Sequence, residues 1–324
     1  MHIHVIHENA AWLEPLARAL DAERLPWRDW FLDRGVFDLS QPPPDGVFYN
    51  RMSASSHTRD HRYSAELTAG VLAWLTAHGR RVVNGPRALD LEISKARQYA
   101  ALDAAGIRTP KSVLVAGKDD VAAAARTHFA GEPVILKPNR GGKGLGVRLF
   151  HTVSALAAYL DGPDYEPPVD GLLLLQQYVR APVIGPSGPL ITRAEFIGGR
   201  FLYAVEVDTS DGFELCPADQ CEVGDAFCPA GDEKPRAKFT IVDGIDTPLR
   251  DRYEAFLAAN DIAVAGIEFI RAAADGTVYT YDVNTNTNYN PDAEARAGRS
   301  AMTALARFLG GELSRLSHRA AAAE

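Results

Sequence analysis

The 324-residue sequence predicts an α/β protein with several lobes. Strand-like and helix-like segments alternate through residues 1–92, which is typical of a parallel sheet with helices on its faces. An apolar strand at Val134–Lys137 ends in a lysine and runs directly into a glycine-rich loop. Two late strands, near Ile262–Ala272 and Thr277–Asn284, carry carboxylates within apolar sequence.

Composition excludes several classes of protein. Hydrophobic residues make up 46% of the chain and charged residues 23%, values that are ordinary for a globular enzyme. The net charge of −8 argues against a general nucleic-acid binder, which needs a basic face. Because no segment approaches 18 apolar residues and the N-terminus lacks a basic start, we expect neither a membrane span nor a signal peptide. A cytoplasmic protein without membrane partners is expected.

The first lobe is expected over residues 1–92. Its alternating apolar pattern predicts three strands, which are His2–His7, Asp45–Asn50 and Arg81–Asn84. Two helices are expected between them, Ala11–Asp21 and Ala65–His78, and Gly79 is expected to stop the second.

The second lobe is expected over residues 93–179. It begins with a helix at Ser94–Ala105, for which Gly106 is the expected C-cap. Four strands and two helices should follow: strands Ser112–Val115, Val134–Lys137, Val147–Phe150 and Leu172–Tyr178, and helices Val121–Phe129 and Val153–Leu160.

The third lobe is expected over residues 180–312, followed by a tail at 313–324 that frays at its end. Four strands are predicted, at Leu190–Ile197, Phe201–Val207, Ile262–Ala272 and Thr277–Asn284. Helices are predicted at Pro248–Asn260 and, as one continuous element, at Asp292–Leu309.

The loop after Lys137 has the composition of a polyphosphate site. Its sequence, P-N-R-G-G-K-G-L-G-V, combines glycines with two further cations, Arg140 and Lys143. Glycines let the backbone approach a ligand closely and turn N–H groups toward an anion. Arg140 and Lys143 could instead be ordinary loop charges. The loop therefore indicates a polyphosphate site only if other parts of the chain carry residues that suit one.

The late strands carry the matching feature. Asp282 and Asn284 are two residues apart on a strand and therefore point to the same side. A hairpin pairing would bring Glu268 beside them, and Glu268 lies in apolar sequence where a carboxylate without a partner is costly. Carboxylate and amide oxygens suit Mg²⁺. The alternative is a solvated polar hairpin.

In the order of these features the chain resembles the ATP-grasp superfamily. The stretch I-S-K-A-R-Q-Y-A-A-L-D-A-A-G-I-R-T-P-K-S, which contains Lys95, is similar to the opening of the glutathione-synthetase and RimK-type branch. The resemblance covers about residues 80–312 and implies a three-lobed architecture. It comprises an N-terminal parallel α/β pre-ATP-grasp domain and two lobes that clamp ATP.

The resemblance also implies roles for individual residues. Arg193, Lys137 and Lys143 would act on the transferring phosphoryl group. ATP would be bound by Lys95, Lys137, Arg140, Gly141, Gly142, Lys143, Gly144, Gly146 and the hinge residues Gln176, Gln177, Tyr178 and Val179. Two Mg²⁺ ions, for which Mn²⁺ can substitute, would be held by Glu268, Asp282 and Asn284.

The chain departs from the family pattern at three places. Gln177 stands where the hinge usually has an acid, and Asp282 stands where the metal site usually has a glutamate. The usual acid for the ribose is absent, which leaves Glu195 as a weak candidate for that contact. The metal geometry and the ribose contact therefore stay open.

The implied activity is a carboxylate–amine ligase that proceeds through an acyl phosphate on amino-acid or short-peptide substrates. Arg51, in a cationic segment after a first-lobe strand, and Asn286, Asn288 and Arg296, after the metal strand, are the expected substrate contacts. The alternatives are a small-molecule kinase of the same fold and a non-catalytic ATP-binding regulator. Homo-oligomers are common in the branch, but these residues do not indicate a state.

Three cysteines, Cys216, Cys221 and Cys228, match neither a disulfide framework nor a standard zinc site. Reduced thiols are expected, and a metal or redox role is the alternative.

Overall fold

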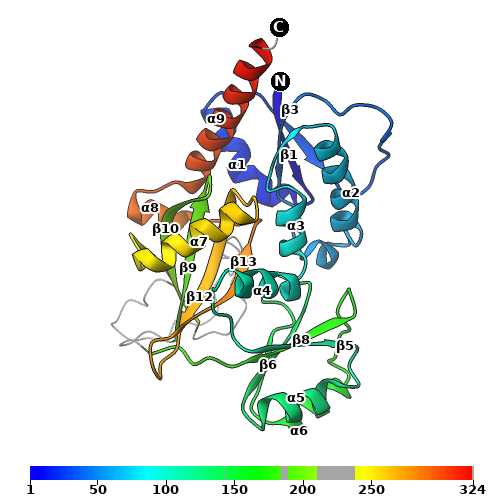
Figure 1. Cartoon of the computed structure of the whole chain (residues 1–324), viewed down its shortest axis with the longest axis vertical. Coiled ribbons are helices and arrows are strands. Elements are labelled where there is room, and N and C mark those ends of the chain that lie inside the picture. Colours follow the sequence, from blue (N-terminus) through cyan, green and yellow to red (C-terminus); the bar gives the residue numbers. More distant parts are fainter. Residues whose placement is uncertain (143, 184–188, 210–237, 323–324) are drawn as a thin grey trace, which may run out of the picture.

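The computed structural model describes residues 1–142, 144–183, 189–209 and 238–322. Lys143 and the three cysteines lie outside the described residues, so the expectations for them are not tested. The described chain contains three sheets, one in each lobe (Figure 1). Mixed parallel and antiparallel pairing within an α/β chain agrees with the fold class that the sequence predicts.

The first lobe is a parallel sheet of order β2-β1-β3-β4, as the alternating pattern predicts. Its strands are β1 (His2–His7), β2 (Trp27–Phe31), β3 (Gly46–Asn50) and β4 (Arg81–Val83). Side chains alternate between its faces: Ile3 and Val5 pack toward α1 (Ala10–Ala22), whereas Ile6 packs toward α2 (Ser64–Ala77) and α3 (Pro86–Glu92). A one-turn 3-10 helix, Ser56–Arg59, follows β3.

Sequence reasoning missed β2 and α3. The β2 sequence W-R-D-W-F is an edge strand with a half-exposed pattern, so it lacks the apolar run that identifies the buried strands. The helix α3 begins with Pro86 after Gly85, which is a valid helix start that is too short to show a helical period.

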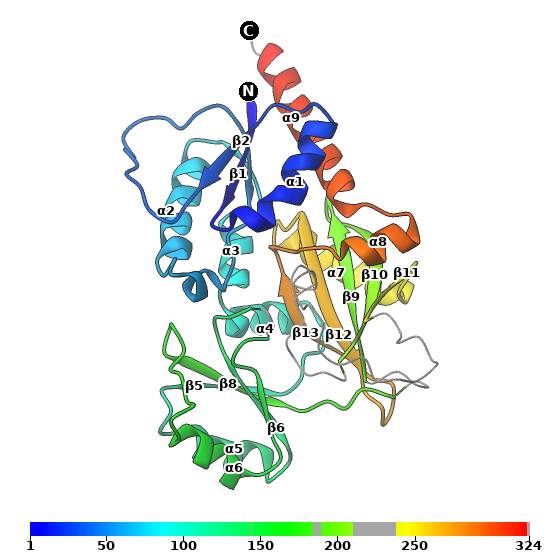
Figure 2. The same ribbon diagram turned by 180° about the vertical axis from the view of Figure 1, so that it is seen from behind.

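The middle lobe is a four-stranded antiparallel sheet of order β5-β8-β6-β7. It comprises β5 (Ser112–Ala116), α5 (Val121–Phe129), β6 (Val134–Pro138), β7 (Arg148–Phe150), α6 (Val153–Leu160) and β8 (Leu172–Gln177). The helices α5 and α6 cover the outer face of this sheet, at the end of the molecule opposite the C-terminus (Figure 2). The helix α4 (Lys95–Ala104) links the first lobe to the middle one.

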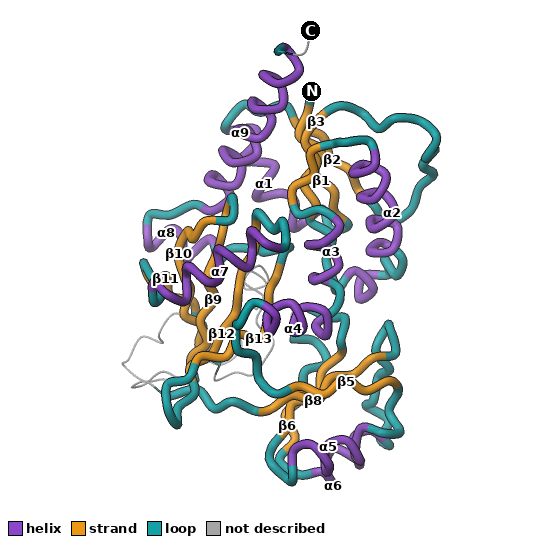
Figure 3. Tube along the Cα trace, in the orientation of Figure 1, coloured by secondary structure: helices purple, strands orange, loops and turns teal. Residues whose placement is uncertain are grey.

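The third lobe is an antiparallel sheet of order β11-β10-β9-β12-β13. Its elements are β9 (Leu190–Ile197), β10 (Arg200–Asp208), β11 (Phe239–Val242), α7 (Thr247–Ala259), β12 (Val264–Arg271) and β13 (Val278–Asn284). The tube in Figure 3 shows β12 and β13 running side by side toward α4 and the middle lobe. The short strand β11 is not among the predicted strands.

The prediction of one helix over Asp292–Leu309 is wrong. Two helices occur, α8 (Pro291–Ala297) and α9 (Ala301–Ala321), because Gly298 adopts a left-handed conformation (φ 63°) and Ser300 caps a new helix. The expected tail from residue 313 is also wrong in part, since α9 continues to Ala321. Leu305, Leu309 and Leu313 of α9 pack into the core of the first lobe.

Candidate functional site

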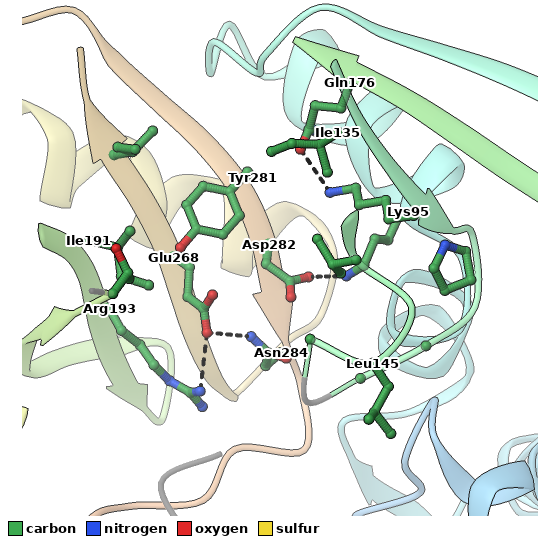
Figure 4. Close-up of a pocket in the computed structure, with 18 of the residues that line it drawn as sticks. Lys95, Ile135, Leu145, Gln176, Ile191, Arg193, Glu268, Tyr281, Asp282 and Asn284 are labelled. Carbon is green, nitrogen blue, oxygen red and sulfur yellow. Dashed lines mark hydrogen bonds and ion pairs between the residues drawn. The ribbon is translucent and has the colours of Figure 1, made fainter. Parts of the chain in front are cut away.

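A cleft lies where the three lobes meet, and residues of all three line it. The first lobe contributes Trp12, Ser53 and Ser55. The linking helix α4 and the middle lobe contribute two lysines, the glycine loop and the residues after β8. The third lobe contributes the faces of β9, β12 and β13 (Figure 4). Arg193, Lys95, Lys137, Glu268, Asp282 and Asn284, all predicted from the sequence, therefore lie in one pocket.

Lys95 is held at the first turn of α4. Ser94 caps the helix by accepting from the N–H of Arg97, and the Lys95 N–H donates to the carbonyl of Asn139 at 3.1 Å. The Lys95 ammonium then donates to Asp282 Oδ1 at 2.7 Å across the cleft. Burial favours neutral forms of both groups, but their mutual attraction dominates: it raises the pKa of Lys95 and lowers the pKa of Asp282.

Lys137 lies at the end of β6 and is only 4% exposed. Its ammonium donates to Gln176 Oε1 at 3.0 Å and to the hydroxyl of Tyr99. Neither partner is charged, so no ion pair offsets the cost of burial, and the more distant charges of Asp282 and Glu268 offset it only in part. Burial, and then the positive charge of Lys95, lowers the pKa of Lys137 to about 7. The two lysines of the cleft therefore differ in charge state near neutral pH.

The β12–β13 hairpin brings the oxygen ligands together as expected. Glu268 pairs directly with Asp282, and Asn284 Nδ2 donates to Glu268 Oε1 at 3.3 Å. A β-bulge beside Glu268 adds a residue to β13, and Tyr281 therefore lines the cleft together with its neighbour Asp282. Burial raises the pKa of Glu268, and the opposing charge of Arg193 only partly offsets it.

Arg193 on β9 pairs with Glu268 on β12, which in turn pairs with Asp282 on β13, so the three residues form a row across the sheet. Its Nε donates to Glu195 at 2.7 Å, its Nη1 to Glu268 at 3.3 Å and its Nη2 to the hydroxyl of Thr287. The guanidinium lies over Gly266, where a Cβ atom would come within 2.5 Å of Nε. Gly266, two residues before Glu268, therefore leaves the space in which the guanidinium of Arg193 crosses β12.

Glu195 does not line the cleft and is only 2% exposed. It lies behind Arg193 and accepts hydrogen bonds from Arg193 and from Thr287, the latter at 2.9 Å. This placement overturns the weak suggestion that Glu195 contacts a ribose.

The glycine loop lies in the cleft, but one of its cations does not. Gly141, Gly142 and Gly144 line the pocket. Gly146 borders it, packing on Pro138 with a φ of 73°. Arg140 is turned away: its Nη1 donates to Glu66 of α2 at 2.7 Å and its Nη2 to Ser56 at 3.4 Å. The expectation that Arg140 contacts the nucleotide is therefore not met; it ties the loop to the first lobe.

The predicted hinge lines the cleft along Gln176, Gln177, Tyr178 and Val179. The Gln177 side chain is exposed, and its Oε1 accepts from the N–H of Lys111 at 3.3 Å. The side-chain oxygen of Gln177, which stands where the family usually has an acid, is thus engaged by the backbone at Lys111.

Of the expected substrate contacts, three lie together and one does not. Asn286 and Asn288 line the cleft, and Arg51 lies behind them and donates to both side-chain oxygens. Arg296 of α8 donates to the carbonyl of Phe239 at 2.9 Å and is not among the residues that line the pocket. Its expected role in substrate binding is not supported by this placement.

The donor set of the hairpin fits a magnesium ion. Glu268, Asp282 and Asn284 present carboxylate and amide oxygens to one side, which is the hard-ligand chemistry that Mg²⁺ prefers. Asn284 donates through Nδ2, so its Oδ1 stays available. Within the described ranges no group of three or more His, Cys, Asp and Glu residues forms a separate metal site. No described helix is long and apolar enough to cross a membrane.

Sequence reasoning missed several residues that shape the site. Tyr99 accepts from Lys137 and donates to the carbonyl of Tyr281 at 2.8 Å, joining α4, β6 and β13. Glu92 of α3 accepts from the N–H of Thr285 at 2.6 Å and fixes the chain after the metal strand. Both come from elements far apart in sequence, so no local pattern marks them.

Comparisons with known proteins agree on the fold. No protein-family model matches the chain, and no curated protein matches it. Among solved structures, the ATP-grasp ligase PsnB in complex with a minimal precursor has a TM-score of 0.66 at 18% identity, over 96% of this chain and 99% of that one. A RimK domain ATP-grasp protein from Sphaerobacter thermophilus DSM 20745 has a TM-score of 0.64 at 16% identity, over 95% and 99%.

A further match is D-alanyl-alanine synthetase A from Vibrio cholerae, with a TM-score of 0.65 at 12% identity over 97% of this chain and 98% of that one. At such low identities the likeness concerns the fold. It extends over nearly the full length of every chain compared, and the lysine-tipped strand, glycine loop and acidic hairpin meet where the lobes join. This chain therefore has the ATP-grasp fold.

Proposed function

We propose that this chain is an ATP- and Mg²⁺-dependent carboxylate–amine ligase that forms an amide bond and releases ADP and phosphate. One observation carries the proposal: three basic side chains, two of them buried and one partly buried, face two carboxylates and an amide in a single cleft. The residues are Lys137, Arg193, Lys95, Glu268, Asp282 and Asn284. Such a set suits a polyphosphate bridged by divalent ions. Neighbours of the same fold include PsnB complexes with Mg and ADP and with AMPPNP.

In the proposed reaction a carboxylate oxygen attacks the γ-phosphorus of ATP, and ADP leaves. The amine nitrogen then attacks the acyl phosphate carbon, and phosphate leaves with the bonding electrons. When bound, Mg²⁺ would neutralise the phosphate oxygens and orient the γ-phosphoryl group. Glu268, Asp282 and Asn284 would hold one or two such ions, and Mn²⁺ could substitute.

The residues of the chain would mainly position charge. Arg193 already uses Nε and one N–H on each terminal nitrogen, so one N–H on each terminal nitrogen remains for the transferring group. Because the guanidinium is fixed by Glu195 and Thr287, it would need little reorganisation as charge develops. Lys95 and Lys137 would face the remaining phosphates, and the glycine loop would exclude water from the acyl phosphate.

Phosphate release tests the proposal. The purified protein is incubated with ATP and Mg²⁺ and pools of amino acids and short peptides, and responding pools are analysed by mass spectrometry. A ligase requires two organic substrates and forms a product lighter than their sum by one water. The D282N variant is the matched control and should release much less phosphate in the same pools at the same Mg²⁺ concentration.

Other outcomes would contradict the proposal. ADP formation without free phosphate, with a product that gains a phosphoryl group, would identify a kinase instead. Tight Mg²⁺-dependent ATP binding without turnover in any pool would favour a regulatory protein.

A further inference from the structure

Arg51 is a buried guanidinium that is only 3% exposed. Its four hydrogen bonds all go to neutral oxygens: Nη1 donates to the carbonyl of Trp12 at 2.9 Å, Nε to Asn286 Oδ1 at 3.3 Å, and Nη2 to the carbonyl of Thr287 at 3.3 Å and to Asn288 Oδ1 at 2.9 Å. No carboxylate of the described residues forms an ion pair with it. Four of its five N–H groups thus have hydrogen-bond partners, but its charge has no ion-pair partner.

The other buried arginines differ in this respect. Arg140 donates to Glu66 at 2.7 Å, and Arg193 donates to Glu195 at 2.7 Å and to Glu268 at 3.3 Å. A buried charge is costly unless it is compensated, so an arginine buried among neutral groups favours an anion nearby. The position of Arg51, directly behind two residues that line the cleft, indicates where that anion would lie.

The contacts of Arg51 also fix the orientation of both asparagine side chains. A guanidinium has only N–H donors, so the atom that each asparagine turns toward it must be the oxygen. The two NH₂ groups therefore point away from Arg51. Within the described part of the chain these NH₂ groups donate to no other residue, and both asparagines line the cleft, so their amides present donors to it.

The first-lobe side of the cleft offers further hydrogen-bond donors. Ser53 and Ser55 share a hydrogen bond of 2.9 Å and line the same pocket, and Ser55 lies against Gly142 of the glycine loop. Two first-lobe acids, Glu92 and Glu8, already have partners. Glu92 lines the pocket and accepts from the N–H and the hydroxyl of Thr285, at 2.6 Å and 3.1 Å. Glu8 is 1% exposed and interacts with Arg59 at 2.6 Å and His61 at 3.0 Å. Among the described residues, the serines and the two amides thus offer donors at this end of the cleft, and the first-lobe carboxylate that lines it, Glu92, is already hydrogen-bonded to Thr285.

We propose that Asn286 and Asn288, oriented and polarised by Arg51, bind a carboxylate of the substrate. This inference rests on the proposed function, since it assigns a binding residue set to one of the two substrates of the ligase. It also changes the role of Arg51, which acts as a positioning residue instead of contacting the ligand. The carboxylate belongs either to the acid or to the amine substrate, because both can carry one.

Calorimetric binding tests the subsite without requiring turnover. The probes are the standard amino acids and their alanyl dipeptides, each as the free acid and as the C-terminal carboxamide, added to protein saturated with Mg²⁺ and AMPPNP. We expect free acids to bind at least about tenfold more tightly than their carboxamides. N288D and N286D replace a donor by an anion and should weaken binding of the acids by about ten- to hundredfold.

The matched control is N290D, in the same loop. Asn290 caps α8 by accepting from the N–H of Ala293 at 2.8 Å, and aspartate caps equally well, so the acids should bind as to the wild type. R51M should lose the preference for acids over carboxamides, and circular dichroism shows whether it folds. If R51M does not fold, the asparagine variants still decide the question.

The outcomes separate this inference from the proposed function. Equal binding of acids and carboxamides, unchanged binding to N288D, or no binding of any probe while AMPPNP binds would each overturn the subsite. Acid-selective binding that N288D removes would support it, even if phosphate release failed and the ligase proposal fell. Once substrates are known, replacing the carboxylate of each in turn by a carboxamide identifies which molecule supplies it.

Discussion

Replacing Lys137 by methionine should remove a proton uptake that accompanies nucleotide binding. Burial and the charge of Lys95 lower the pKa of Lys137 to about 7, and its two contacts, Tyr99 and Gln176, are neutral. At pH 8 only about one tenth of the molecules would carry the ammonium form. A polyphosphate beside Nζ favours that form and raises the pKa, so binding at pH 8 should take up ~0.9 proton per site, against ~0.1 at pH 6.

The assay is calorimetric titration with Mg·AMPPNP at both pH values in two buffers of different ionisation enthalpy. The dependence of the observed enthalpy on the buffer gives the number of protons taken up. The difference between wild type and K137M isolates Lys137 from the titration of the nucleotide itself. K118M is the control, because Lys118 is a surface lysine that does not line the cleft and should leave the uptake unchanged.

The sign of the effect also predicts the pH dependence of affinity. Above pH 7 the wild type must bind a proton to bind the nucleotide well, so its affinity should fall as pH rises, by up to about tenfold per pH unit, while that of K137M should not follow. Equal proton uptake by wild type and K137M, or the same uptake at pH 6 and pH 8, would refute the reasoning.

Three further variants test the third-lobe side of the cleft. G266A should lower kcat and reduce the free energy of unfolding by about 1–3 kcal/mol, because its Cβ would meet Arg193 Nε at 2.5 Å. Phosphate release measures kcat and calorimetric melting measures the stability. A kcat equal to that of the wild type would contradict this prediction. E195Q keeps the side-chain shape but loses the charge-assisted hydrogen bond to Arg193. We therefore expect kcat to fall about ten- to hundredfold while the KM for ATP changes little. A rise in KM alone would argue against a positioning role of Glu195. D282N should raise the Mg²⁺ concentration needed for half-maximal activity by more than about tenfold, measured by magnesium titration, and an unchanged requirement would exclude Asp282 as a ligand.

Prediction from local sequence succeeded where all the residues that define a feature lie within one strand or turn. An apolar run that ends at Lys137 and passes into glycines predicted both β6 and its position at the cleft. The spacing of Asp282 and Asn284 predicted that they share a face, and the hairpin pairing of Glu268 followed from the Asp275–Gly276 turn. Strand periodicity and turn chemistry act over a few residues, which makes them readable from the chain.

The wrong predictions concern residues whose position depends on partners in other segments of the chain. Arg140 and Arg296 look like free cations in sequence, yet partners on α2 and β11 take them away from the cleft. The β-bulge that brings Tyr281 into the cleft breaks the alternation on which strand reasoning depends. Glu195 could be no more than a weak candidate for a ribose contact, because its partners, Arg193 and Thr287, come from two separate segments.

By itself, then, the sequence determined the α/β class and the parallel first sheet, and it predicted the basic residues and the carboxylate and amide oxygens that meet at the cleft. Only the tertiary structure decided which charges face one another. It pairs Lys95 with Asp282 while leaving Lys137 among neutral groups, and it places Arg51 behind two asparagines without a carboxylate. The physical reason is that charge state and side-chain orientation depend on burial and on partners that lie 38 to 237 residues away in these examples, which no local pattern encodes.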